Sequence, residues 1–260
     1  MKYISSKENS TYKSLIKLKK KKHRDETGTY IIEGIKPLAD ALNAGCPVHE
    51  IFVREGNGIG LIPEERSFRM FELESSLFDN VSDTENSQGV VAVASSNILG
   101  KEQFAAFLRE ERNKGGNIAV LDRLQDPGNV GTIIRTAEAA GYRGIILMKG
   151  TADPYSPKVA RAAAGTLFRM PLMQAEDEKD VVDIAGRLGK KLVVSCPEGA
   201  TDCFETDLSS DIALVIGNEG RGTSEEFIEK ADIRVKIPME GKIESLNAAV
   251  AAGILMYRKK

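Results

Sequence analysis

The sequence contains few of the residues that build metal centres and disulfide scaffolds. It has three cysteines, two histidines and no tryptophan. Cys46, Cys196 and Cys203 are odd in number and form no C-x-x-C pair, so we expect neither a disulfide framework nor a zinc site. His23 and His49 both lie in the first fifth of the chain, so the C-terminal half has no histidine for a Ser–His or Cys–His catalytic pair. We therefore expect chemistry without a metal, in a reducing, cytoplasmic environment.

Long apolar runs are also missing. No stretch approaches the roughly 18 residues that a membrane helix needs, and residues 1–8 lack the apolar core of a signal peptide. Hydrophobic residues make up 42% and charged residues 28% of the 260 positions, which is typical of a globular protein with room for two domains. We expect no membrane partner.

Positive charge is concentrated at the N-terminus, although the net charge is −2. Residues 1–24 carry nine Lys or Arg and one Glu. Such clusters bind polyanions by releasing counterions, although a solvated helix face without a partner is the alternative. Tyr12, Leu15 and Ile16 form one apolar stripe, which favours a docked helix over a loose tail. The densest basic positions are Lys17, Lys19, Lys20, Lys21, Lys22 and Arg24.

The pattern along the chain predicts two α/β domains joined by a linker. Over residues 1–96, we expect strands at 30–33, 48–53, 68–71 and 89–94 and helices at 36–44 and 75–81. Residues 97–116 are interpreted as a linker that contains a helix over 102–112. Over residues 117–260, the expected strands are 118–121, 144–148, 192–195, 212–216 and 233–237. The expected helices there are 130–140, 157–164, 179–188, 224–230 and 246–257. This alternation predicts a parallel sheet covered on both faces, whose ligands bind at the carboxyl ends of strands.

The first polar motif follows the strand at 118–121. Asp126-Pro-Gly predicts a turn, and Asn129 is expected to cap the helix that follows. Apolar residues at 130, 133, 134 and 137 predict the buried stripe of this helix, which leaves Arg135 on another face. Taken alone, Arg135 would be explained by a surface contact with Glu138.

The second motif follows the strand at 212–216 and reads Gly-Asn-Glu-Gly-Arg-Gly-Thr over 217–223. Its three glycines predict a sharp turn with open backbone amides and carbonyls. The spacing is close to that of a P-loop, but Thr223 stands where a P-loop needs Lys, so nucleotide hydrolysis is not expected and a phosphate binder remains only a weak alternative. Glu219 is either a site residue or a cap of a neighbouring turn.

The third motif joins the strand at 233–237 to a helix rich in Ala and Gly. The small residues allow that helix to pack very close to other backbone. We expect Ser245 and Asn247 in its first turn, where they can cap the helix or face a ligand.

In this order the three motifs resemble those of the SpoU family, the TrmH-like RNA 2′-O-ribose methyltransferases. The matching patterns are Asn129-x-Gly131-x3-Arg135-x-Ala137, Ile216-Gly-Asn-Glu219-x-x-Gly222 and Ile237-Pro-Met-x-Gly241-x3-Ser245-Leu-Asn247. Residues 163–171 are similar to the family's intervening segment, and the stretch through Gly34 is similar to its substrate-binding domain. The chain departs from the family after Asn247, where Ala248-Ala249 replaces Val-Ser, and at its end, where Tyr257-Arg258 replaces Tyr-Glu.

The resemblance implies a fold, a reaction and partners. Residues 117–260 would form an α/β trefoil knot, and residues 1–96 a ribosomal-protein-like α/β RNA-binding domain that contacts RNA through the basic cluster. S-adenosylmethionine would donate its methyl group to a ribose 2′-hydroxyl of structured RNA, without a metal. The partner RNA would be ribosomal, most naturally 23S, and the C-terminal domain would form a homodimer. A transfer RNA 2′-O-methyltransferase and a non-catalytic RNA-binding ribosome-assembly factor on the same fold are the alternatives.

The resemblance also implies roles for single residues. Arg135 would be catalytic, and because a guanidinium pKa of roughly 12.5 to 13.8 makes it a poor base, we expect it to clamp a substrate phosphate and ribose. Asn129 and Glu219 would orient Arg135 and the loop, while Ser245 and Asn247 would shape the pocket around the hydroxyl. Gly217, Ile237 and Leu246 would hold the cofactor largely through backbone groups, with Ser195 and Met239 lining the pocket.

Overall fold

The computed structural model describes residues 1–57, 68–110, 113, 115–196, 200–243 and 245–258. The chain divides into two compact units. The N-terminal unit contains Met1–Ser96 together with Tyr155–Arg169, and the C-terminal unit contains Asn97–Pro154 and Met170–Lys260. Residues 155–169 therefore belong by contact to the first unit, although they lie in the second half of the sequence.

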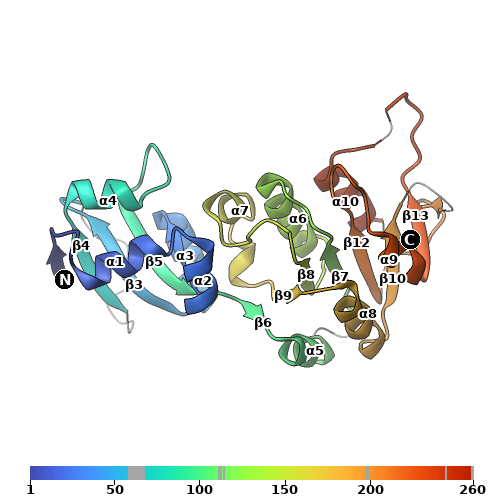
Figure 1. Ribbon diagram of the computed structural model, residues 1–260, viewed down its shortest axis with the longest axis horizontal. Helices are drawn as coiled ribbons and strands as arrows, with labels where there is room; N and C mark the ends of the chain where they lie inside the picture. Colours follow the sequence, from blue (N-terminus) through green and yellow to red (C-terminus); the bar gives the residue numbers. More distant parts are fainter. Residues whose placement is uncertain (58–67, 111–112, 114, 197–199, 244, 259–260) are drawn as a thin grey trace. The chain divides into compact units, whose positions relative to one another are not determined.

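The N-terminal unit is built on a mixed five-stranded sheet with the order β1-β4-β3-β5-β2 (Figure 1). Its strands are β1 (Lys2–Ile4), β2 (Thr29–Glu33), β3 (Val48–Arg54), β4 (Arg69–Leu73) and β5 (Val90–Ser95). The β1, β3 and β4 strands run parallel, whereas β5 is antiparallel to both β2 and β3. Along β2, buried Tyr30 and Ile32 alternate with half-buried neighbours, as the period-two pattern of a strand requires.

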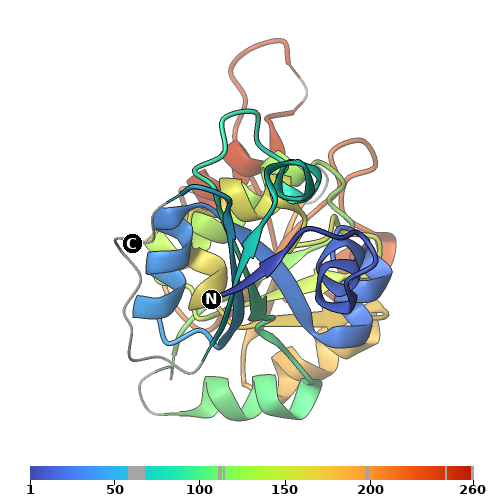
Figure 2. The ribbon, with the colours of Figure 1, turned by 90° about the vertical axis from the view of Figure 1, so that its left-hand side faces the viewer.

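Helices cover both faces of this sheet. They are α1 (Ser10–Lys17), α2 (Lys21–Thr27), α3 (Ile35–Asn43), α4 (Ser75–Val81) and, from the later segment, α7 (Pro157–Ala162), which precedes the 3-10 turn η2 (Thr166–Phe168). Figure 2 shows α3 on one side of the sheet and α1 on the other. Leu15 and Phe78 pack against Phe52 and Phe71, whose rings stack at 5.1 Å. The basic segment, expected as one helix, forms two, because the chain leaves helical geometry at Lys20 before α2 begins.

The C-terminal unit confirms the predicted parallel sheet. Eight strands lie in the order β11-β13-β10-β12-β7-β8-β9-β6, and each pairing between them is parallel. They are β6 (Ile98–Leu99), β7 (Ile118–Leu121), β8 (Gly144–Met148), β9 (Leu172–Ala175), β10 (Lys191–Ser195), β11 (Thr201–Asp202), β12 (Ile212–Ile216) and β13 (Ile233–Lys236). We did not expect β1, β6, β9 or β11, which have two to four residues each and too few positions to show a period.

The helices of this unit are α5 (Lys101–Arg109), α6 (Pro127–Ala139), α8 (Glu178–Arg187), α9 (Glu225–Lys230) and α10 (Ala248–Met256). In Figure 1, α6 and α10 lie on one side of the sheet, and α5 and α8 on the other. Helices α6 and α10 approach closely, since a Cβ built on Gly253 would lie 3.9 Å from the Thr136 methyl carbon. None of the helices in the described ranges has the length and apolar character required to traverse a bilayer.

The sheet brings the three motifs to one edge. Strand β12 lies between β7 and β10, and β10 lies between β12 and β13. Because these strands are parallel, the segments that follow β7, β12 and β13 all leave the sheet at its carboxyl edge, where ligands of such folds bind.

Candidate active site

Helix α6 begins with an Asp cap rather than the expected Asn cap. The Asp126 carboxylate accepts a hydrogen bond from the Asn129 amide at 2.8 Å, and Pro127 occupies the first helical position. The prediction that Asn129 caps this helix was therefore wrong, because proline favours that first position and so moves the cap to the residue before it. Asn129 lies instead in the first turn, where its side chain can bond elsewhere. The predicted buried stripe of α6 is confirmed.

Side chains from all three motifs form one hydrogen-bonded chain. The Asn129 amide group donates to Glu219 Oε1 at 3.1 Å, and its oxygen accepts a hydrogen bond from Asn247 Nδ2 at 2.9 Å. Asn247 also caps α10, where Oδ1 accepts from the Ala249 amide at 2.9 Å. Ser245 is exposed and precedes this cap, so the expectation that it lies in the first helical turn was wrong.

Glu219 anchors the second motif against the first. Besides Asn129, its carboxylate accepts hydrogen bonds from the backbone amides of Gln125 and Asp126, each at 3.3 Å. Partial burial raises the pKa of Glu219, but these hydrogen bonds outweigh burial and hold the pKa below its ordinary value. Glu219 therefore places a negative charge beside the N-terminal turn of α6, where the helix dipole favours one.

Arg135 is exposed on α6 two turns beyond its start. Within the described part of the chain, its guanidinium forms no hydrogen bond or ion pair, so the surface contact with Glu138 is not formed. Neither Asn129 nor Glu219 forms a hydrogen bond or ion pair with it. The guanidinium is consequently available to an anion from outside the chain, such as a phosphate.

The loop over residues 217–223 folds back on itself. Asn218 and Gly222 exchange two backbone hydrogen bonds of 2.9 Å, and the Asn218 side chain donates to the Arg123 carbonyl at 2.7 Å. Position 217 admits only glycine, since a Cβ there would lie 2.4 Å from the Thr223 nitrogen. The Thr223 hydroxyl donates to the Ser195 carbonyl at 3.0 Å, which ties this loop to the end of β10.

Asp122 and Asn218 are site residues that we did not predict. Asp122 is fully buried, pairs with the Arg123 guanidinium at 2.8 Å, and accepts a hydrogen bond from the Ser224 amide at 2.9 Å. It thereby joins the first motif to the beginning of α9. The sequence did contain a signal for both residues, namely a polar side chain just after a buried strand. Asp122 directly follows β7, and Asn218 and Glu219 come within three residues of the end of β12.

The residues that we expect to hold the cofactor are partly accessible, as residues that contact a ligand must be. Ser195, Gly217, Ile237, Met239 and Leu246 are each half-buried, so apolar surface and backbone groups remain open at the carboxyl edge. The tight backbone at Gly217 leaves no room for a side chain of the protein. These features fit a ligand that is recognised through backbone groups and apolar surface. Among the described residues, no cluster of three or more His, Cys, Asp or Glu could hold a metal.

The basic cluster of the N-terminal unit is partly neutralised. Three of its lysines pair with carboxylates: Lys19 with Asp83, Lys21 with Asp25, and Lys22 with Glu26. Lys17 and Lys20 form no ion pair with any residue in the described ranges. Arg24 is buried and donates to the Leu18 carbonyl at 2.6 Å, so it stabilises the turn between α1 and α2 instead of extending the exposed basic surface.

Comparison with family models divides the chain into two matches. The model described as the SpoU rRNA Methylase family matches residues 116–257, and an MRM3-like substrate binding domain matches residues 9–92. The protein of Bacillus subtilis (strain 168) named 23S rRNA (guanosine(2553)-2′-O)-methyltransferase RlmP is 35% identical over 259 residues, with 99% of this chain and 98% of that protein covered.

Solved structures resemble the whole chain as well. The AdoMet-bound rRNA methyltransferase from Sinorhizobium meliloti has a TM-score of 0.85 and 31% identity, with 99% of this chain and 96% of that chain covered. The SpoU methyltransferase AviRb from Streptomyces viridochromogenes, in complex with AdoMet, has a TM-score of 0.84 and 27% identity, with 96% of each chain covered.

Proposed function

Because this chain belongs to the SpoU rRNA methylase family and is an RNA 2′-O-ribose methyltransferase that uses S-adenosylmethionine, we propose that its substrate is 23S ribosomal RNA. The RlmP relative, whose name specifies 23S rRNA, supports this target because the similarity extends over both units. The match of residues 9–92 to a substrate-binding domain supports an RNA contact by the N-terminal unit.

The observation that carries the proposed site is the hydrogen-bonded chain Asn247–Asn129–Glu219. Its middle residue lies on α6, the helix that also presents Arg135, for which the described residues supply no partner. S-adenosylmethionine supplies the sulfonium methyl group when it is bound. Gly217, Ile237 and Leu246 hold it through backbone groups, with Ser195 and Met239 beside them.

Arg135 acts as a clamp in this proposal. Its planar fork binds a substrate phosphate bidentately, which positions the ribose and lets the proton of the 2′-hydroxyl pass to a phosphate oxygen. Asn129 and Glu219 fix the first turn of α6 and thereby the place of Arg135 on the helix. Asn247 and Ser245 shape the pocket around the hydroxyl.

The proposal includes the organisation of the chain. Residues 1–96 bind RNA, residues 97–116 link the domains, and residues 117–260 form a trefoil knot of a cytoplasmic homodimer. Helix α10 supports the dimer because it is almost wholly apolar, yet Val250 is 52% and Tyr257 at its end 57% exposed.

Sedimentation should therefore give a dimer for the wild-type protein and a monomer for Val250→Asp, because the new carboxylate would be buried in the interface. A wild-type monomer would contradict this part of the proposal.

Methyl transfer tests the function directly. Purified protein and labelled S-adenosylmethionine are incubated with total RNA from a strain that lacks this protein, and the modified ribose is then mapped. We expect label at one 2′-oxygen of 23S rRNA. Label in transfer RNA would overturn the target, and a protein that binds RNA without binding S-adenosylmethionine would be an assembly factor.

A further inference from the structure

A cavity of about 260 Å³ lies in the N-terminal unit, and its lining includes none of the residues assigned above to methyl transfer. Its walls come from β2, the start of α3, the turn after α1, α2, the loop after α4, and the segment Tyr155–Arg169. Pockets for drug-sized ligands usually measure roughly 300 to 1,000 Å³. This cavity is therefore suited to one group smaller than a drug-sized ligand.

The interior of the cavity is aromatic and aliphatic. The rings of Tyr30 and Tyr155 lie 4.2 Å apart at 37°, and both side chains are buried. Ile32 and Leu167 add buried aliphatic surface, and half-buried Phe168 also lines the space. Proteins that bind single-stranded RNA place unstacked bases against aromatic surfaces of this kind.

The opening carries unpaired positive charge. Lys36 and Arg161 line the cavity, are exposed, and form no ion pair within the described ranges. Of the carboxylates at the cavity, Asp83 is paired with Lys19 at 3.2 Å. Within the described ranges, the Asp40 side chain forms no hydrogen bond or ion pair, so it can accept hydrogen bonds from a ligand, and its oxygen lies near Gly165.

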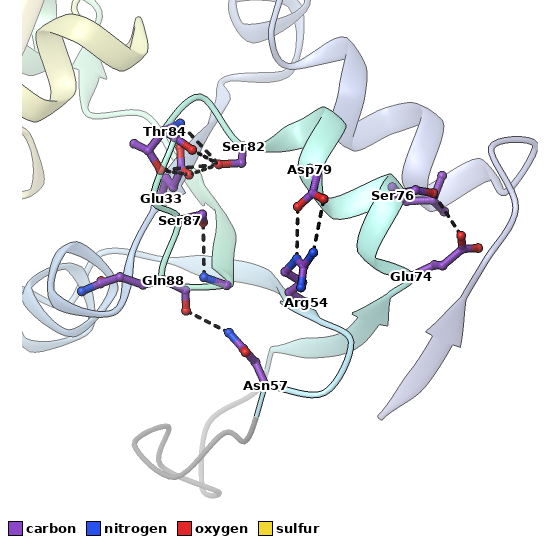
Figure 3. Close-up of polar contacts among 12 residues, drawn as sticks. Glu33, Arg54, Asn57, Glu74, Ser76, Asp79, Ser82, Thr84, Ser87 and Gln88 are labelled. Atoms are coloured by element: carbon purple, nitrogen blue, oxygen red, sulfur yellow. Dashed lines mark hydrogen bonds and ion pairs between the residues drawn. The ribbon is translucent and has the colours of Figure 1, made fainter.

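The wall beside the opening is preformed. Glu33, at the end of β2, accepts hydrogen bonds from the Ser82 hydroxyl, the Thr84 hydroxyl at 2.7 Å, and the Asp83 amide at 3.0 Å (Figure 3). These contacts hold the loop after α4 in place and leave Glu33 satisfied. A ligand would thus enter a cavity that needs little reordering, which favours affinity.

We propose that this cavity holds the base of one unpaired nucleotide of the RNA substrate, other than the nucleotide that is methylated. The base lies against the aromatic interior, Asp40 accepts hydrogen bonds from its N–H groups, and Lys36 and Arg161 bind the adjoining phosphate. Lys19 also lines the cavity, so the basic cluster leads to its opening. This inference rests on the proposed RNA substrate and adds a specificity contact to it.

Two variants test the cavity by kinetics. Ala160→Phe fills it from α7, and the double variant Lys36→Glu/Arg161→Glu reverses the charge at its opening. We expect each to raise the KM for ribosomal RNA roughly tenfold, with kcat at saturating RNA and the Kd of S-adenosylmethionine unchanged. Lys179→Glu/Lys230→Glu, an equal charge change at two exposed lysines of α8 and α9, is the control and should leave the KM at the wild-type value.

Crosslinking gives a readout that does not need methyl transfer. RNA with 4-thiouridine in place of uridine is irradiated with the wild-type protein, and crosslinked peptides are identified. We expect peptides from 30–40 and 155–169, and their loss in Ala160→Phe. Wild-type KM in the charge-reversed variant, or crosslinks confined to other peptides, would overturn the cavity proposal. Absence of methyl transfer by a wild-type protein that still crosslinks there would overturn the proposed function alone.

Discussion

At the scale of single residues, Arg135 is an exposed cation for which the described part of the chain supplies no partner. Lysine would keep its charge but lose the planar fork that grips a phosphate at two points. We expect Arg135→Lys to lower kcat for methyl transfer roughly 100-fold, while calorimetry finds the wild-type affinity for S-adenosylmethionine.

The matched control for that variant is Arg143→Lys, since Arg143 is also exposed and follows α6 in the same unit. It should turn over like the wild type. A turnover of Arg135→Lys near that of Arg143→Lys would contradict the clamp.

Glu219 links the site to pH. A carboxylate whose pKa is lowered by folding stabilises the folded state above the unfolded-state value of 4.5, and this contribution disappears as the pH falls through the lower folded value. We expect Glu219→Gln to reduce the free energy of unfolding by about 1 kcal/mol near neutral pH. Urea melts at falling pH should show the two proteins converging below pH 4.5. A difference that does not vary with pH would show that the charge of Glu219 is not responsible.

At the scale of elements, the N-terminus of α6 both caps the helix and carries Asn129 of the proposed site. The N-terminus of α8 has the same kind of cap but no site residue, so it provides a comparison. Asp126 caps α6 and Asp177 caps α8 in the same manner, each through a side-chain oxygen that accepts a backbone amide three residues on. Replacing either with Ala should cost about 1 kcal/mol of stability. Only Asp126→Ala should also slow methyl transfer, because it frees the turn that carries Asn129. Equal activity of the two variants would show that the Asp126 cap does not contribute to the proposed site.

Element types could largely be predicted from the sequence, whereas their ends could not. The stripe of α6 was readable because Val130, Ile133 and Ile134 recur at helical spacing. Its beginning was ambiguous, since Asp126 and Asn129 are both good caps and only the backbone at Pro127 decides between them. The break between α1 and α2 could not be predicted from the sequence, because lysine is compatible with both a helix and an extended turn.

At the scale of the whole molecule, RNA affinity should depend on salt through the unpaired lysines. We expect Lys17→Gln/Lys20→Gln to reduce the slope of log K against log salt concentration by about 1 to 2. Arg24→Gln should instead lower stability by roughly 1.5 to 3 kcal/mol, because its buried guanidinium bonds to a backbone carbonyl. Titrations at several salt concentrations, with urea melts of each variant, separate the two effects. An unchanged slope in the double lysine variant would remove the basic cluster from the RNA interface.

The site itself could be predicted as a set of residues but not as an arrangement. Glu219 lies 90 positions and Asn247 118 positions from Asn129, and spacing along the chain contains no information about contact over such distances. The residue types and their spacing within each motif indicated the reaction. Only the sheet reveals that Asn129 bonds to both partners while Arg135 bonds to neither.

The all-parallel sheet also sets the timing of assembly during synthesis. Strand β7 (Ile118–Leu121) pairs with β12 (Ile212–Ile216), which lies more than 90 positions later in the sequence. This pair therefore cannot form until most of the chain has left the ribosome. Pairing over such separations is slow, because the entropy of closing a long loop must be overcome first. The N-terminal sheet, whose strands end at Ser95, can form well before then. Nascent chains of this protein should therefore carry a folded N-terminal sheet while β7 and β12, which build the catalytic edge, are not yet paired with each other.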